Sequence, residues 1–293
     1  MNAIEIHSLK KYYGKNRGID GISLTVAQGE FFGFIGPNGA GKSTTIRTLL
    51  GLIHPTDGSA RILGLDMKED QKKILALTGY LPSEAVFYPG MRVRDVLKLS
   101  ADLRKKECRS EASRLCERLQ LDPSRKVEEL SFGNRKKAAI VCALQHDPRL
   151  LILDEPTSGL DPLMQKEFFE ILREKNKAGA TVFLSSHILS EIQRNCTRAA
   201  IIREGNIIAC DHVEALAKTS AKRVNLHGRA KLEKLPGVKD LQQTEDTANF
   251  LYNGDIRSLL DVLSKGEIRD ISISEPDLEE IFLHYYEKGG ARK

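Results

Sequence analysis

A glycine-rich loop at residues 36–44 constrains this chain more than any other feature of its sequence. Gly36, Gly41, Lys42 and Ser43 match the pattern G-x-x-x-x-G-K-[ST] of phosphate-binding loops. Glycine lets the backbone curl closely around a phosphate, Lys42 offers a full positive charge, and the Ser43 hydroxyl can bind Mg²⁺. The predicted nucleotide-binding residues of this phosphate loop are Gly36, Asn38, Gly39, Ala40, Gly41, Lys42, Ser43 and Thr44.

The surroundings of the phosphate loop predict the class of the fold. The loop follows a continuous apolar run at residues 31–35, which is typical of a strand buried on both faces, and it precedes a helical pattern at 42–50. Two more such runs, at 150–153 and 181–184, are each followed by a helical pattern. Strands that alternate with helices indicate an α/β fold with a parallel sheet.

Charge and periodicity divide the chain further. Alternating apolar residues before position 30 predict two strands of an antiparallel edge sheet, and residues 86–145 have a helical pattern throughout. From Arg223 onward the chain has 11 basic and 13 acidic residues, a net charge of −2, whereas the segment before it has +7. The predicted organisation is an α/β core at 1–217 with a helical subdomain at about 86–145, a linker at 218–222 and a small α+β domain at 223–293.

The tail has its own pattern of elements. Strand-like runs occur at 224–226, 250–252 and 268–273, with helical patterns at 255–265 and 276–287. The last helical pattern has an apolar stripe, which leaves open whether it packs on its own domain or binds a groove of a partner.

Composition excludes several classes of protein. The net charge of +5 comes from 45 basic and 40 acidic residues, which is too balanced for a nucleic-acid-binding surface, so no nucleic-acid partner is expected. No apolar stretch approaches the roughly 20 residues that span a bilayer, and the first residues lack a secretory signal, so a cytoplasmic location is expected. The five cysteines show no CxxC spacing and are expected to be reduced structural thiols.

A pair of acidic residues ends the apolar run at 150–153. Asp154 can hold Mg²⁺ through water, and Glu155 can polarise an attacking water molecule. Alone, such a pair could equally cap a helix. Together with the phosphate loop, it predicts hydrolysis of the bound nucleotide.

The motifs, and the order in which they follow one another along the chain, resemble those of the ATP-binding subunits of ABC transporters. The resemblance covers residues 1 to about 217. LSFGN at 130–134, the signature segment, stands in the place of the family's LSGGQ. Residues 158–161 (SGLD), called the SGLD loop below, match the loop that crosses to the opposite subunit in the family, and this loop includes Asp161. His187 matches the histidine that contacts the γ-phosphate, so that Glu155, His187 and Lys42 are the predicted catalytic residues.

The resemblance also implies contacts with adenine and with a second subunit. Tyr13 matches the aromatic residue that stacks on adenine, with the adjacent Tyr12 as the alternative. In the family, the signature segment of one subunit contacts the ATP of the other. Ser131 and Gly133 are therefore expected to bind the γ-phosphate of a partner, either a second copy or a paralogous ATPase.

The chain departs from the family pattern at two places. Phe132 and Asn134 replace a glycine and the glutamine of the signature segment. Ser83 stands where the family has a glutamine that senses Mg²⁺, and Glu84 follows it, so Ser83 is the third predicted metal residue beside Ser43 and Asp154.

The tail, which ends in EPDLEEIFLHYY, resembles that of type-2 exporter ATPases, and LSFGN resembles the bacitracin-export type. The resemblance implies an ATP- and Mg²⁺-dependent motor that drives efflux through separate integral membrane subunits, at the inner face of the cell membrane. The alternatives are a soluble ABC ATPase without a transport role and a nucleotide-binding regulatory protein.

Overall fold

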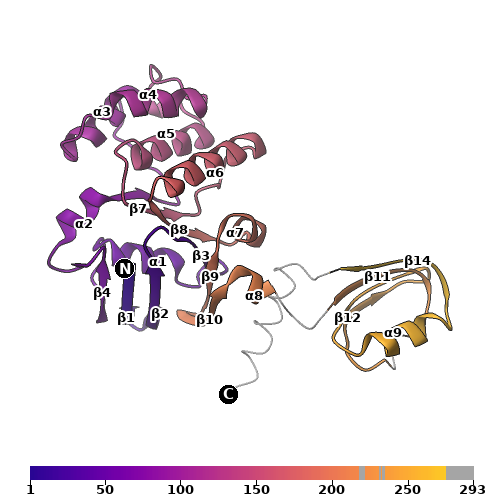
Figure 1. Cartoon of the computed structure of the whole chain (residues 1–293). Coiled ribbons are helices and arrows are strands. Elements are labelled where there is room, and N and C mark those ends of the chain that lie inside the picture. The colour runs from indigo at the N-terminus through magenta and orange to yellow at the C-terminus, as the bar shows by residue number, and fades with distance from the viewer. Residues whose placement is uncertain (218–221, 231, 233–234, 275–293) are drawn as a thin grey trace. The chain divides into compact units, whose positions relative to one another are not determined.

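The computed structural model describes residues 1–217, 222–230, 232 and 235–274. The chain divides into two compact units, Met1–Val213 and Glu214–Lys293 (Figure 1). The predicted linker at 218–222 lies outside the described residues except for Lys222, which begins a strand. Among the described residues, no helix is long and apolar enough to cross a membrane.

A six-stranded sheet carries the phosphate loop. Neighbouring strands are parallel except for the pair β9 and β10, which confirms the predicted parallel α/β core. Every residue of β3, β7 and β8 is buried, as expected for continuous apolar runs that are covered on both faces. In spatial order the strands are β10 (Asn206–His212), β9 (Arg198–Arg203), β3 (Phe31–Ile35), β8 (Thr181–Ser186), β7 (Leu150–Asp154) and β6 (Thr78–Leu81).

A second sheet is antiparallel, and it confirms the predicted edge sheet. Two of its strands were expected from alternation, whereas the other two are short and mostly polar, so their pattern gave no signal. Its strands are β2 (Asn16–Ala27), β1 (Asn2–Tyr13), β4 (Asp57–Ile62) and β5 (Leu65–Asp66), in that spatial order. One apolar core joins both sheets to α1 (Lys42–Leu49), with Ile6, Phe34 and Ile46 among its buried members. Because β3 and α1 are both anchored in this core, the loop between them is held at both ends.

Most remaining helices of the first unit lie between β6 and β7 in the chain. Figure 1 shows α3, α4 and α5 together at one end of this unit and β1, β2 and β4 at the other end. The helices between β6 and β7 are α3 (Val93–Leu103), α4 (Arg109–Arg118), the short 3-10 helix η1 (Val127–Glu129) and α5 (Phe132–Leu144). The others are α2 (Gln71–Leu77) before β6, α6 (Pro162–Lys177) after β7 and α7 (Leu189–Asn195) after β8.

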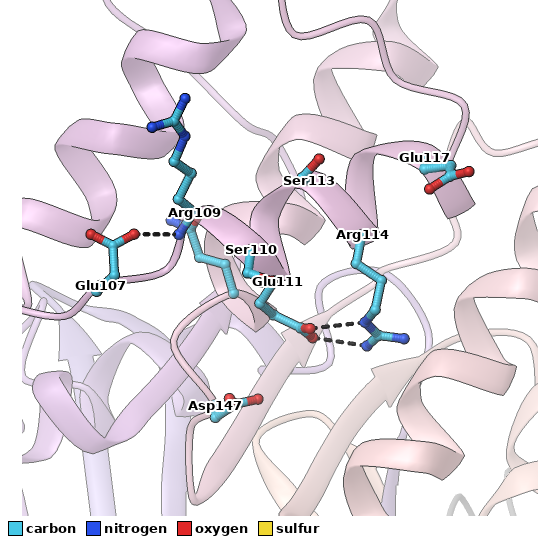
Figure 2. A pocket seen from close by; sticks show the side chains of 9 residues that line it. Glu107, Arg109, Ser110, Glu111, Ser113, Arg114, Glu117 and Asp147 are labelled. Atoms are coloured by element: carbon cyan, nitrogen blue, oxygen red, sulfur yellow. Dashed lines mark hydrogen bonds and ion pairs between the residues drawn. The ribbon is translucent and has the colours of Figure 1, made fainter.

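Ion pairs join α4 to α6. Arg118 lies 2.5 Å from Glu174, and Lys175 lies 2.5 Å from Glu111. Figure 2 shows a surface pocket beside α4, in which Arg114 donates two hydrogen bonds of 2.8 Å to Glu111. The pairs Arg118–Glu174 and Lys175–Glu111 run between the two helices, so they fix α4 against α6.

The second unit contains an antiparallel sheet with one described helix packed into its core. Val224, Leu226, Phe250 and Leu259 are among its buried residues. Three strands and the first helix of the tail were predicted, but β12 was not, because its sequence VKDLQQ is polar. The predicted helix at 276–287 lies outside the described residues. The elements are α8 (Val213–Ala217), β11 (Lys222–Arg229), β12 (Val238–Gln243), β13 (Thr247–Tyr252), α9 (Ile256–Leu263) and β14 (Glu267–Ser274), with the sheet order β12-β13-β11-β14.

All five cysteines are free thiols in the structure. Burial raises the pKa of the Cys116 thiol to about 11, which disfavours the reactive thiolate. The predicted structural role of the thiols fits this environment.

Candidate active site

The phosphate loop turns sharply between the end of β3 and the start of α1. Gly41 has a φ of 110°, a left-handed conformation that favours glycine. A Cβ at Gly41 would lie 2.7 Å from the Gly18 carbonyl oxygen, and one at Gly36 would lie 2.6 Å from the Ile202 carbonyl oxygen. Both positions therefore need glycine because other backbone segments pass too close for a side chain.

Lys42 lies inside the loop with only 4% of its surface exposed. Its Nζ donates to the carbonyl oxygens of Gly36 at 2.6 Å and Pro37 at 3.1 Å. The same atom lies 3.1 Å from Oε1 of Glu155. The ammonium thus joins the loop to the predicted general base.

Asp154 is fully buried at the carboxyl end of β7. Its Oδ1 accepts a 2.6 Å hydrogen bond from the Ser185 hydroxyl on the neighbouring strand β8. Its Oδ2 is also buried, and it has no hydrogen-bond partner among the described residues. A buried carboxylate oxygen without a partner is unfavourable unless a cation or water binds it, so this atom fits a Mg²⁺ site.

Glu155 is held in a backbone conformation that is unusual for its residue type. Its φ of 47° is left-handed, and its N–H donates to the Ser185 carbonyl oxygen at 3.1 Å. Its Oε2 lies 3.2 Å from Nδ1 of His187. Burial alone would raise the pKa of Glu155, but the hydrogen bond and charge of Lys42, helped by His187, outweigh it and lower the pKa. The carboxylate is therefore ionised at neutral pH, as a general base requires.

Two residues that sequence reasoning missed fix the turn that carries His187. The Ser186 hydroxyl donates to Oε2 of Glu191 at 2.8 Å and accepts from the Ile188 N–H at 2.9 Å. Glu191 is 8% exposed, which is unusual for a carboxylate. The serine before the predicted histidine was a signal, but its partner Glu191 could be identified only in three dimensions.

The signature segment lies against the SGLD loop within one subunit. A Cβ at Gly159 would lie 2.2 Å from the Phe132 ring, and one at Gly133 would lie 2.6 Å from the Gly159 carbonyl oxygen. Ser131 caps α5, since its hydroxyl accepts from the Asn134 N–H at 3.3 Å. In the part of the chain that the structure describes, no hydrogen bond or ion pair joins this segment to the phosphate loop.

Asp161 has a structural task in this subunit. It caps α6, because its Oδ1 accepts from the Met164 N–H at 3.0 Å. Its predicted contact with a nucleotide, like those of Ser131 and Gly133, depends on a second subunit.

Tyr13 lies beside the phosphate loop and remains accessible. A Cβ at Gly18 would lie 3.1 Å from the Tyr13 ring and 2.9 Å from the side chain of Thr44, the last residue of the phosphate loop. Tyr13 and Thr44 therefore lie on either side of Gly18. The Tyr13 ring is 48% exposed, and Lys11 Nζ lies 5.1 Å from its centroid. A hydrogen bond to Asp20 raises the pKa of the Tyr12 hydroxyl, so Tyr12 is already engaged. This geometry favours Tyr13 over Tyr12 as the aromatic residue for adenine.

Ser83 is held through its backbone. Its carbonyl oxygen accepts a 2.9 Å hydrogen bond from Nζ of Lys136, a residue of α5 that the sequence did not single out. Burial lowers the pKa of Lys136 to about 8, although the charges of Asp154 and Glu155 oppose this shift. Glu84, the alternative to Ser83, is exposed to solvent.

Comparisons with known families agree with this architecture. The family described as ABC transporter matches residues 19–158, and the ATP-binding protein DrrA1-3-like C-terminal domain matches residues 214–286. An uncharacterized ABC transporter ATP-binding protein of Bacillus subtilis, YhaQ, is 33% identical over 98% of this chain and 99% of its own length. The bacitracin transport ATP-binding protein BcrA of Bacillus licheniformis is 34% identical over 96% of both chains. The linearmycin resistance ATP-binding protein LnrL of Bacillus subtilis is 30% identical over 96% of this chain and 97% of its own.

Solved structures support the same conclusion. The ATP-binding subunit of an ABC transporter superposes with a TM-score of 0.69 at 30% identity, covering 73% of this chain and 91% of that one. The dimeric cassette MJ0796 bound to ADP and Pi shares the fold, with a TM-score of 0.66 at 20% identity, over 72% of this chain and 98% of its own. The relatives are transporter subunits, so neither a soluble ATPase without a transport role nor a regulatory protein is supported. The chain belongs to the ATP-binding, ATP-hydrolysing subunits of ABC transporters of the exporter type.

Proposed function

We propose that this chain is the motor of an exporter whose membrane-spanning part is a separate protein. The observation that carries this proposal is the cluster at the carboxyl ends of β3, β7 and β8. There Lys42 and His187 both contact Glu155, and Asp154, the residue before Glu155, presents an oxygen that has no partner among the described residues. The relatives named for bacitracin transport and linearmycin resistance support an antimicrobial compound as the cargo.

The residues divide the work of hydrolysis as follows. The backbone N–H groups of the phosphate loop and the Lys42 ammonium bind the β- and γ-phosphates of ATP. Glu155 takes a proton from the attacking water, and His187 holds Glu155 in place while contacting the γ-phosphate. When ATP binds, the negative phosphates attract the Lys42 ammonium away from Glu155. The freed carboxylate can then accept a hydrogen bond, and afterwards the proton, from the attacking water.

Asp154 and the Ser43 hydroxyl would hold Mg²⁺. Both supply hard oxygen ligands, which Mg²⁺ prefers, and Asp154 Oδ2 lacks another partner among the described residues. Bound Mg²⁺ supplies positive charge that neutralises the triphosphate. Ser83, the third predicted ligand, is supported only by its position after β6.

The complete site needs two ATPase subunits. Ser131 and Gly133 begin a helix, where backbone N–H groups favour an anion, and they are unconnected to this subunit's own phosphate loop in the described structure. We infer that they bind the ATP of a second copy or of a paralogue. In this arrangement ATP closes the dimer, and hydrolysis opens it.

Stacking of adenine on Tyr13 gives a testable difference between two adjacent residues. Replacement of Tyr13 by alanine should raise the Kd for ATP about tenfold, because aromatic stacking on a base contributes about 1–3 kcal/mol. Calorimetric titration with ATP measures it. Tyr12→Ala is the matched control and should leave the affinity within about twofold; if Tyr12→Ala has the larger effect, the assignment of Tyr13 is wrong.

The transport role is tested by determining whether an integral membrane protein is encoded beside this chain, and then by co-expressing the two. We expect the chain in the membrane fraction only when that protein is present, and Glu155→Gln should bind the membrane equally well while failing to support efflux. A chain that stays in the soluble fraction, or efflux that survives Glu155→Gln, would contradict the proposal.

A further inference from the structure

Lys136 is the most deeply buried cation outside the phosphate loop among the described residues. Only 1% of its surface is exposed, less even than the 4% of Lys42. Removal of an ammonium group from water is unfavourable unless hydrogen bonds and opposite charges replace the water. The position of Lys136 on α5, the helix that Ser131 caps, therefore needs an explanation that the assigned nucleotide contacts do not give.

The contacts of Lys136 lead to a loop far away in the sequence. Its Nζ donates to the carbonyl oxygens of Pro82 at 3.0 Å and Ser83 at 2.9 Å. These two residues directly follow β6, which pairs with β7, the strand that ends at Asp154. One side chain thus connects α5 to the end of β6, the strand beside the one that leads to Asp154 and Glu155.

The carboxylates also act on the charge of Lys136. The negative charges of Asp154 and Glu155 favour its ionised form, and these are the only charged groups with a resolved effect on it among the described residues. The direct partners of the ammonium are the two loop carbonyl oxygens, and the acidic pair acts on it only through charge at a distance. A residue that only filled space at this position would need neither.

We propose that Lys136 is a positioning residue that holds the loop at 82–83 against α5, so that the signature segment and the strands that carry the active-site carboxylates move together. The role rests on the ATPase function given above. The connection uses the long Lys136 side chain of α5 and the backbone carbonyl oxygens of the loop, and it does not involve the short Ser83 side chain. Closure of the signature segment on a partner's ATP is in this way linked to the site at the end of β7.

The test compares three variants of the full chain. Lys136→Met removes the donors and the charge, Lys136→Gln keeps N–H donors without the charge, and Lys106→Met is the control. Lys106 also donates to a carbonyl oxygen, that of His146 at 2.7 Å, but it is an exposed residue between α3 and α4. The measurements are kcat and KM for ATP, the Kd for ATP, and hydrogen–deuterium exchange of peptides across the first unit.

We expect Lys136→Met to lower kcat about tenfold with the Kd for ATP within about threefold of the wild type, as for loss of hydrogen bonds from a charged group that does not contact substrate. Exchange should rise in peptides that cover residues 82–88 and not in β1 or β2. Lys136→Gln should recover most of the rate, and Lys106→Met should match the wild type.

The proposal is overturned if Lys136→Met keeps the wild-type kcat. It is also overturned if exchange rises uniformly across the first unit, or if Lys136→Gln is as impaired as Lys136→Met, because the residue would then act only through stability or charge. A wild-type chain that binds but does not hydrolyse ATP would contradict the ATPase function instead. In that case the local change in hydrogen–deuterium exchange would still test the hydrogen bonds between Lys136 and the loop.

Discussion

Replacement of Lys42 by alanine is expected to abolish ATP binding at ordinary nucleotide concentrations. The change removes the only side-chain charge within the phosphate loop and its hydrogen bonds to two loop carbonyl oxygens. Loss of one partner from a buried, charged contact costs about 2–5 kcal/mol, which corresponds to a weakening of about thirtyfold to several thousandfold. Calorimetric titration with ATP gives the affinity directly.

The matched control for this change is Lys68→Ala. Lys68 is exposed and lies far along the chain from the loop, so its loss should leave the Kd for ATP unchanged. Circular dichroism and the melting temperature show whether Lys42→Ala remains folded. A folded Lys42→Ala variant with wild-type affinity would mean that the loop at 36–44 is not the phosphate site.

Replacement of Glu155 by glutamine is expected to lower turnover by about 10²–10⁴ while ATP still binds. Glutamine has nearly the same shape and can still accept a hydrogen bond from Lys42, but it cannot take a proton from water. The loop charge and the Asp154 carboxylate are unchanged, so the Kd for ATP should stay within about threefold.

Release of phosphate under saturating ATP measures the effect of Glu155→Gln. The control is Glu117→Gln, which makes the same chemical change at an exposed position of α4 and should keep the wild-type rate. Hydrolysis by Glu155→Gln at the wild-type rate would show that another group is the base.

Much of the fold could be predicted because its signals are local. The runs at 31–35, 150–153 and 181–184 are almost entirely apolar, and the structure places each in a fully buried strand of one sheet. The phosphate loop is contiguous in sequence, so its pattern could be recognised without knowledge of the fold. By contrast, β12 is polar and had no such pattern.

The parts of the site that escaped prediction depend on contacts between distant residues. Lys136 and Ser83 are 53 positions apart, and no periodicity indicates that an ammonium would reach that carbonyl oxygen. The contact of Phe132 with Gly159 likewise joins two segments that read as separate motifs. The left-handed backbone of Glu155 is imposed by its place after β7 and by the hydrogen bond of its N–H to Ser185, not by its residue type.

The central claim is that each chain holds half of an ATP site and that ATP completes the site by joining two subunits. The mass of Glu155→Gln in solution, measured by light scattering with ATP and Mg²⁺, tests it most directly, because this variant binds ATP without consuming it. We predict twice the mass of a single chain with ATP, a single chain with ADP, and a single chain for Glu155→Gln combined with Ser131→Arg, although that double variant should still bind ATP. A Glu155→Gln variant that is saturated with ATP and remains a single chain would contradict the account of two copies that share their sites.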